Sequence, residues 1–253
     1  MTRRGIGRGL VVAGALTLGL IAPVPAVAQS DAATKLDVQI KDALATCYQC
    51  HGPGGVSIIP SRPSIAGQKA EYVRRQLLAF KVASGAMAQD QDGDGDDHSS
   101  IADLPGRTDP VMEHMAAGLP DQLLAPVAQA VSQLACDGGK PKKAPLRRLT
   151  RPRAANKCVI CHGMDGIGTQ GYIPNLAGQQ RSYLRRQLLL IRETAWGAQP
   201  REGEAWRSHP IMEAQAARIK IADVDAIARY YAQMDCNGSA ESSGAATGLS
   251  GFE

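Results

Sequence analysis

The stretch CYQCHG at residues 47–52 recurs as CVICHG at residues 158–163. Each copy places two cysteines three positions apart, with a histidine directly after the second cysteine. At the same offset, RPSIAGQ (62–68) aligns with IPNLAGQ (173–179), and EYVRRQLLAF (71–80) aligns with SYLRRQLLLI (182–191). The chain is therefore a tandem duplication of one ancestral unit.

The repeat continues with a shorter offset, because the first half carries extra residues before RTDPVMEHMA (107–116), which aligns with RSHPIMEAQA (207–216). Apolar residues recur at helical spacing in the RRQLL segments, and residues 120–135 and 221–234 read as closing helices. Neither half shows a convincing alternating strand pattern. The sequence predicts an all-α fold, with short helices opening each unit just before its paired cysteines.

The chain ends and the junction between the halves differ in composition from the repeat. Residues 1–28 combine three arginines, an apolar run and a small-residue site at Ala28, which predicts a cleaved export signal. Without it, the formal charge of +4 falls to near +1, which does not favour nucleic-acid binding. The predicted order is a first domain (31–136), a basic linker (137–157), a second domain (158–236, with a start near 147 as the alternative) and a disordered tail (237–253).

The CxxCH pattern is the attachment signature of c-type haem. Two thiols at this spacing can add to the two vinyl groups of haem, and the adjoining histidine reaches the iron. Cys47, Cys50 and His51 are thus predicted to hold one haem. The second haem is assigned to Cys158, Cys161 and His162. A redox dithiol does not need the histidine, and zinc would require further ligands at close spacing.

The second axial ligand is assigned from the repeat. Met112 in DPVM and Met212 in HPIM occupy equivalent positions after the haem peptide, so both are predicted to bind iron. His114 and His209 are rivals without histidine counterparts in the other half. Methionine and histidine together raise the reduction potential relative to two nitrogen ligands.

Two pairs of residues are expected around these ligands. Pro63 and Pro174 each follow their histidine by twelve positions, and a proline carbonyl can accept the second ring N–H of a ligating histidine. Arg107 and Arg207 match in the loops before the methionines, where they either pair with haem propionates or face solvent.

CxxCHG, P-x-[IL]-AGQ, Y-x-R-R-Q-L-L, a PxM loop and a closing helix, twice over, resemble the dihaem cytochromes c of the c-four type. The resemblance covers most of residues 40–236. It implies two class I cytochrome c domains related by a pseudo-twofold, with His/Met ligation and haems close enough to exchange electrons. It also implies a periplasmic shuttle between respiratory complexes and terminal oxidases or reductases. Related tandem domains serve as cytochrome subunits of dehydrogenases.

The chain departs from that pattern in two places. Asp90, Asp92 and Asp94 in the insertion match the start of a calcium loop, but the glutamate expected at its twelfth position is Ile101. The insertion is read either as an acidic solvated loop or as a calcium site. Cys136 and Cys236 each follow a closing helix, and they are read either as an interdomain disulfide or as buried free thiols.

The leading functional prediction is electron transfer without bond chemistry, because two filled axial positions keep substrate from the iron. The alternatives are a dihaem oxidoreductase resembling thiosulfate dehydrogenase or a peroxidase, and a fixed cytochrome subunit of a dehydrogenase. The expected partners are a redox protein donor and acceptor, with membrane-surface docking through the basic linker as a further expectation.

Overall fold

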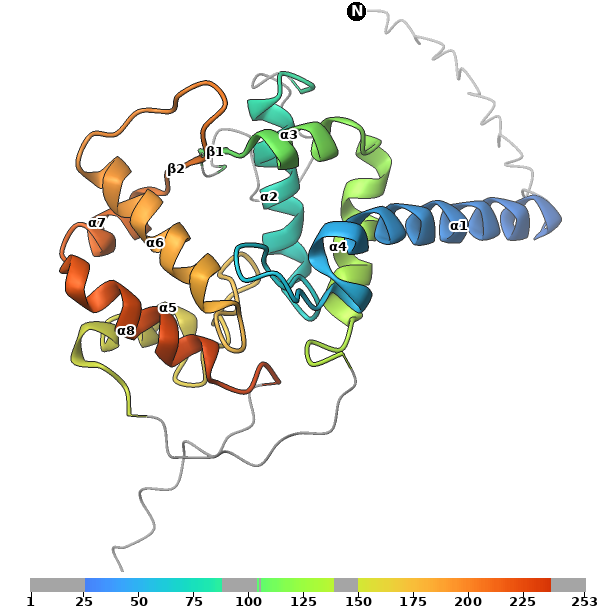
Figure 1. The fold of residues 1–253 in the computed structure, drawn as a ribbon. Helices are drawn as coiled ribbons and strands as arrows, with labels where there is room; N and C mark the ends of the chain where they lie inside the picture. Colours follow the sequence, from blue (N-terminus) through green and yellow to red (C-terminus); the bar gives the residue numbers. More distant parts are fainter. Residues whose placement is uncertain (1–25, 88–103, 105, 139–149, 238–253) are drawn as a thin grey trace, which may run out of the picture. The chain divides into compact units, whose positions relative to one another are not determined.

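The duplication in the sequence is repeated in the order of the secondary-structure elements (Figure 1). The computed structural model describes residues 26–87, 104, 106–138 and 150–237. We call the elements up to α4 the first domain and those from η3 onward the second domain. The first domain contains α1 (Ala26–His51), η1 (Pro53–Gly55), α2 (Ala70–Ala83), β1 (Arg107–Thr108), α3 (Pro110–Ala117) and α4 (Asp121–Gln133). The second contains η3 (Arg153–Ala155), α5 (Val159–His162), α6 (Arg181–Ala195), β2 (Trp206–Arg207), α7 (Pro210–Ala216) and α8 (Ile221–Ala232).

The predicted all-α fold is confirmed, and the packing of the helices also repeats. α2 packs against α3 and α4, and α6 packs in the same way against α7 and α8. The closing helices have Asp121 and Asp223 in their first turns, where a carboxylate suits the positive end of the helix dipole. Their apolar faces bury Val127 and Val131 in the first domain and Ile227 and Tyr231 in the second. Removal of these side chains from water is the main contribution to the stability of each core.

A positively charged side chain near the C-terminal end of the RRQLL helix, α2 or α6, binds a neighbouring loop in each domain. Lys81 is almost fully buried, and its Nζ donates to the carbonyl of Leu119 and pairs with Asp121. Arg192, its repeat counterpart, donates through Nε to the carbonyl of Ile219 at 3.0 Å. Both bonds reach the loop before the closing helix, so they fix the two long helices of each domain against each other.

The first helix is longer than the short opening helix that the sequence predicts. α1 begins at Ala26, ahead of the predicted cleavage site near Ala28, and ends at His51. The chain divides into residues 1–36 and residues 37–253, and the second unit contains both CxxCH segments and both cores. No helix among the described residues is long and apolar enough to span a membrane.

Contrary to the sequence expectation, the structure contains a small sheet. β1 and β2 pair antiparallel, with Arg107 opposite Arg207 and Thr108 opposite Trp206. Each strand has two residues, too few for an alternating pattern to be read from sequence, and the pair forms only between the two domains.

Part of the predicted linker belongs to the second core. Ala155 in η3 is fully buried, and it packs with Ile227, Tyr230 and Tyr231. Within the predicted linker 137–157, residues 139–149 lie outside the described residues. The second core therefore includes a residue that lies before the predicted start at 158.

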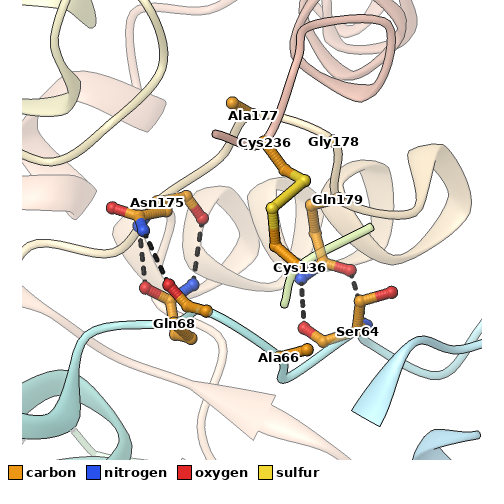
Figure 2. A pocket seen from close by; sticks show the side chains of 10 residues that line it. Ser64, Ala66, Gln68, Cys136, Asn175, Ala177, Gly178, Gln179 and Cys236 are labelled. Carbon is orange, nitrogen blue, oxygen red and sulfur yellow. Dashed lines mark hydrogen bonds between the residues drawn. A yellow bond between two sulfur atoms is a disulfide. The ribbon is translucent and has the colours of Figure 1, made fainter. Parts of the chain in front are cut away.

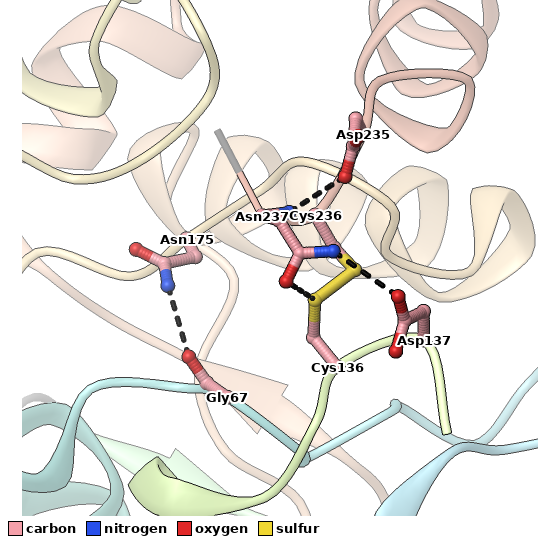
Figure 3. The surroundings of a disulfide bond; sticks show 7 residues. All are labelled: Gly67, Cys136, Asp137, Asn175, Asp235, Cys236 and Asn237. Atoms are coloured by element: carbon pink, nitrogen blue, oxygen red, sulfur yellow. Dashed lines mark hydrogen bonds between the residues drawn. A yellow bond between two sulfur atoms is a disulfide. The ribbon is translucent and has the colours of Figure 1, made fainter. Parts of the chain in front are cut away.

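A disulfide joins the two domains. Cys136 and Cys236 are bonded across a sequence separation of 100 residues, in a small pocket at the interface (Figure 2). Figure 3 shows the flanking contacts, in which Asn237 Nδ2 donates to Asp137 Oδ2 at 3.2 Å. Cys136 lies three residues after the end of α4 and Cys236 four residues after the end of α8, so the bridge ties together the ends of the two repeat units.

Replacing both Cys136 and Cys236 with serine should lower the free energy of unfolding by about 2–4 kcal/mol, because the bridge restricts a long loop in the unfolded chain. Denaturant unfolding of the variant and of the parent would measure the difference. Substituting both residues leaves no unpaired thiol to complicate the comparison. Equal midpoints and slopes for the two proteins would contradict the expectation.

Candidate haem sites

The two CxxCH histidines adopt the same geometry in both domains. His51 ends α1, and its Nδ1 lies 2.8 Å from the carbonyl oxygen of Pro63. His162 ends α5, and its Nδ1 lies 3.1 Å from the carbonyl oxygen of Pro174. A carbonyl can only accept, so Nδ1 carries the proton in both rings. Nε2 of each neutral ring therefore keeps its lone pair for a metal.

The surroundings of both rings favour the neutral imidazole. Burial lowers the pKa of His51 and of His162, and the proline hydrogen bonds only partly oppose this effect. The positive charges of Arg107 near His51 and of Arg207 near His162 lower the pKa further. Neutral imidazole is the form that binds a metal ion.

A glycine directly after each histidine turns the chain sharply. Gly52 and Gly163 have φ values of 82° and 74°. A Cβ at these positions would lie 2.2 Å from the oxygen of Val56 and 2.3 Å from that of Ile167. Only glycine fits there, which explains why the repeated motif is CxxCHG and not CxxCH alone.

The four motif cysteines are free and half-buried: Cys47, Cys50, Cys158 and Cys161. Burial raises the pKa of Cys47 and of Cys158, so both remain thiols and not thiolates near neutral pH. Among the residues that the structure describes, no group of three or more His, Cys, Asp or Glu side chains could hold a metal ion.

Met112 and Met212 occupy the first turns of α3 and α7. The residue before each helix caps it, since Asp109 Oδ1 accepts from Met112 N at 3.3 Å and His209 Nδ1 accepts from Met212 N at 3.4 Å. A glutamate four residues after each cap, Glu113 or Glu213, accepts in return from the backbone N–H of the cap residue. The same reciprocal cap therefore fixes both methionine turns.

The two rival histidines have different surroundings. His114 is exposed, as is the neighbouring Met115. His209 is half-buried, and its Nδ1 is engaged in the cap of α7. Met112 and Met212, in contrast, are both half-buried at equivalent positions.

Arg107 and Arg207 lie opposite each other in the β1–β2 pair and bind both domains. Each arginine donates to a glutamine of its own domain and to a tyrosine of the other, so the two sets of contacts are symmetric. The partners are Gln76 and Tyr183 (2.8 Å) for Arg107, and Gln187 (2.6 Å) and Tyr72 (3.0 Å) for Arg207.

Neither arginine forms an ion pair with a carboxylate among the described residues. Arg207 is 9% exposed, and its Nε is buried without a hydrogen-bond partner in this part of the chain. Burial would raise the pKa of Tyr72, but the charges of Arg207 and Arg107 outweigh it and lower that pKa. The interpretation that Arg207 simply faces solvent is therefore wrong.

Sequence reasoning missed the partners of these arginines. Tyr72 and Tyr183 are equivalent in the repeat, as are Gln76 and Gln187. Their identity in both halves was the available signal, but the two arginines before each glutamine are identical in both halves as well, so the sequence did not single these residues out. The calcium candidates Asp90, Asp92 and Asp94 lie outside the described residues.

Comparison with known proteins identifies the fold and the family of the chain. A family model described as cytochrome c matches residues 153–235. The fold resembles the crystal structure of reduced recombinant cytochrome c4 from Pseudomonas stutzeri, with a TM-score of 0.55 and 24% identity, over 79% of this chain and 98% of that one.

Curated relatives extend the comparison over nearly the whole sequence. A protein named thiosulfate dehydrogenase electron acceptor from Stutzerimonas stutzeri is 28% identical over 204 residues, which cover 76% of this chain and 80% of the relative. Cytochrome c4 of Pseudomonas aeruginosa is 30% identical over 230 residues, which cover 87% of this chain and 96% of the relative. The chain belongs to the cytochrome c4 family of dihaem electron-transfer proteins.

Proposed function

We propose that this protein is a periplasmic carrier that accepts and delivers single electrons through two haems, each capped by histidine and methionine. The observation that carries the proposal is the symmetry of the two sites. Each domain has a histidine with Nδ1 bonded to a proline carbonyl and a methionine in a capped first turn. An enzyme acting at one iron would need an open or labile position there, and thus a difference between the sites.

The residues present fit the haem groups. Cys47 and Cys50 would hold the first haem through thioethers, and Cys158 and Cys161 would hold the second. Nε2 of His51 and of His162 would bind iron on one side. When bound, each haem supplies a one-electron Fe(III)/Fe(II) couple.

Haem propionates would neutralise the positive charges of Arg107 and Arg207 at the domain interface. Arg107 and Arg207 carry guanidinium groups, and the described residues provide them with neutral hydrogen-bond partners. Leaving a buried cation without an anion is costly. A propionate of each haem would bind these arginines in a charge-assisted hydrogen bond, and the unpartnered Nε of Arg207 would be one of its donors.

The partners are proposed as redox proteins. One relative is named an electron acceptor of thiosulfate dehydrogenase, which makes a periplasmic dehydrogenase a reasonable donor class for this chain. Export through a signal within residues 1–28 would place the chain in the same compartment as such an enzyme. The carrier function does not require a permanent complex, because the two domains contain all the proposed ligands.

The test of this function is direct. The protein, matured with the c-type haem attachment machinery, should gain the mass of two haems and show two reversible one-electron steps. Its oxidised spectrum should contain the weak sulfur-to-iron band of methionine ligation. A high-spin fraction, or reaction with a small-molecule substrate at one iron, would contradict the carrier function and favour a dihaem oxidoreductase.

Replacing Met112 or Met212 with histidine should lower the reduction potential of the haem in the same domain, because methionine/histidine ligation raises it. The expected change is a fraction of the about 0.8 V range that axial ligands span. Redox titration followed by absorption measures it. Met115→His, at an exposed neighbouring position, is the matched control and should leave both potentials unchanged.

His209 is proposed to cap α7 and not to bind iron. His209→Asp copies the cap of the first domain, Asp109, and should retain the methionine spectrum and the stability of the parent. His209→Ala should retain the spectrum but lower the free energy of unfolding by about 1 kcal/mol, the usual value of a lost cap. Loss of a low-spin signal in both variants would instead identify His209 as the ligand.

Substituting Arg207 with methionine should lower the reduction potential of the second haem, because a positive charge near the iron favours Fe(II). At the partly screened dielectric of a protein, the expected size is roughly 1–2 kcal/mol. Redox titration would again provide the measurement. Arg181→Met, which removes a surface ion pair with Asp225 in the same domain, is the control; an equal shift in both variants would exclude the propionate role.

A further inference from the structure

Two glutamine side chains cross the interface and bind backbone in the opposite domain (Figure 2). Gln179 Oε1 accepts from Ser64 N at 2.9 Å, and its Nε2 donates to Ser64 O at 2.8 Å. Gln68 makes the same pair with Asn175, since Oε1 accepts from Asn175 N at 2.9 Å and Nε2 donates to Asn175 O at 3.0 Å. Both glutamines come from the AGQ segment of their repeat unit.

Each glutamine accepts a hydrogen bond from a backbone amide group whose carbonyl oxygen binds the histidine of a CxxCH motif. The carbonyl of Pro63 and the N–H of Ser64 belong to one peptide, which accepts from His51 Nδ1 at 2.8 Å and donates to Gln179. The peptide between Pro174 and Asn175 accepts from His162 Nδ1 and donates to Gln68 in the same way. A continuous hydrogen-bonded chain thus runs from each histidine through one peptide to a glutamine of the other domain.

Hydrogen bonds in such a chain polarise one another. When Gln179 accepts from the N–H of the peptide, more negative charge collects on the Pro63 oxygen, and its bond to His51 becomes stronger. A histidine that donates Nδ1–H to a stronger acceptor is a more basic ligand through Nε2. A more basic ligand stabilises Fe(III) over Fe(II) and so lowers the reduction potential.

Burial keeps water from replacing these contacts. Gln68 and Gln179 are each 8% exposed, and the histidines are 8% exposed for His51 and 6% for His162. In such a site the polarising bond is stronger than in water, and losing it leaves a buried N–H without a partner.

We propose that Gln68 and Gln179 are positioning residues that tune the haem of the opposite domain. Gln179 lowers the reduction potential of the haem at Cys47 and Cys50, and Gln68 lowers that of the haem at Cys158 and Cys161. This inference rests on the proposed roles of His51 and His162 as iron ligands. It makes the domain interface part of the electronic environment of both irons.

The test uses the full holoprotein with Gln179→Met or Gln68→Met, each of which keeps the side-chain length but removes the amide. Redox titration followed by NMR separates the two haems through their haem methyl resonances. Gln179→Met should raise the potential of the first haem and Gln68→Met that of the second. The expected change in the reduction equilibrium constant is about threefold to tenfold, from the usual worth of one hydrogen bond.

Gln180→Met is the matched control. Gln180 Nε2 also crosses the interface, to Ser57 O at 2.5 Å, but it does not touch either histidine-bound peptide. This variant should leave both potentials unchanged. The crossed tuning is wrong if Gln179→Met changes the reduction potentials of both haems equally or changes only that of the second haem. It is also wrong if Gln179→Met changes the potentials no more than Gln180→Met does.

A second variant tests the proposal even if loss of the Gln179 side-chain amide disturbs folding. Gln179→Glu is isosteric, and its ionised carboxylate is a stronger acceptor for Ser64 N, although its second oxygen no longer donates to Ser64 O as Nε2 does. It should therefore lower the potential of the first haem, opposite in sign to Gln179→Met, and move the Nδ1–H resonance of His51 further downfield. Shifts of the same sign in both variants would overturn the proposal.

The wild-type protein separates this inference from the proposed function. If its spectrum lacks two histidine/methionine haems, the function fails before any variant is made. If the spectrum has them and the crossed shifts do not occur, only the tuning by the glutamines fails.

Discussion

A half-buried and a buried arginine, facing each other across a sheet of two-residue strands, are the constraint on which the domain interface depends. Arg107 and Arg207 pair in register, and neutral glutamine and tyrosine groups of the described residues accept hydrogen bonds from both of them. The guanidinium of Arg107 also lies over the ring of Phe80, 4.7 Å from its centroid. Like charges opposite each other in a strand pair destabilise it. The proposed haem propionates would supply negative charge that offsets this repulsion at the domain interface.

That constraint explains the symmetry of the contacts around it. Each arginine, each AGQ glutamine and each histidine-bound peptide has a counterpart in the other half, and most of these contacts cross between domains. A duplicated unit meets its own copy with the same surface, so a residue that binds the partner domain does so twice. The contacts that form the methionine turns and the two cores, by contrast, lie within a single domain.

The sequence predicted best what is local or repeated. Cys47, Cys50 and His51 lie within five residues, so their spacing alone indicates the chemistry, and the helical period of the RRQLL segments indicates α2 and α6. The crossed contacts of Gln68 and Gln179 could not be predicted, because they join residues more than a hundred positions apart and depend on how two finished domains dock. The burial of Ala155 was also missed, since a basic stretch outside the repeat looks like linker until its packing is seen.

The disulfide between Cys136 and Cys236 gives the second domain a second tether to the first, in addition to the chain between them. Two tethers raise the effective concentration of each domain at the surface of the other. Individually weak interface bonds then remain formed, although they would not hold two separate domains together. Residues at this interface can consequently be substituted while the two domains stay associated. Their effect on the reduction potentials of the proposed haems can therefore change independently of domain association.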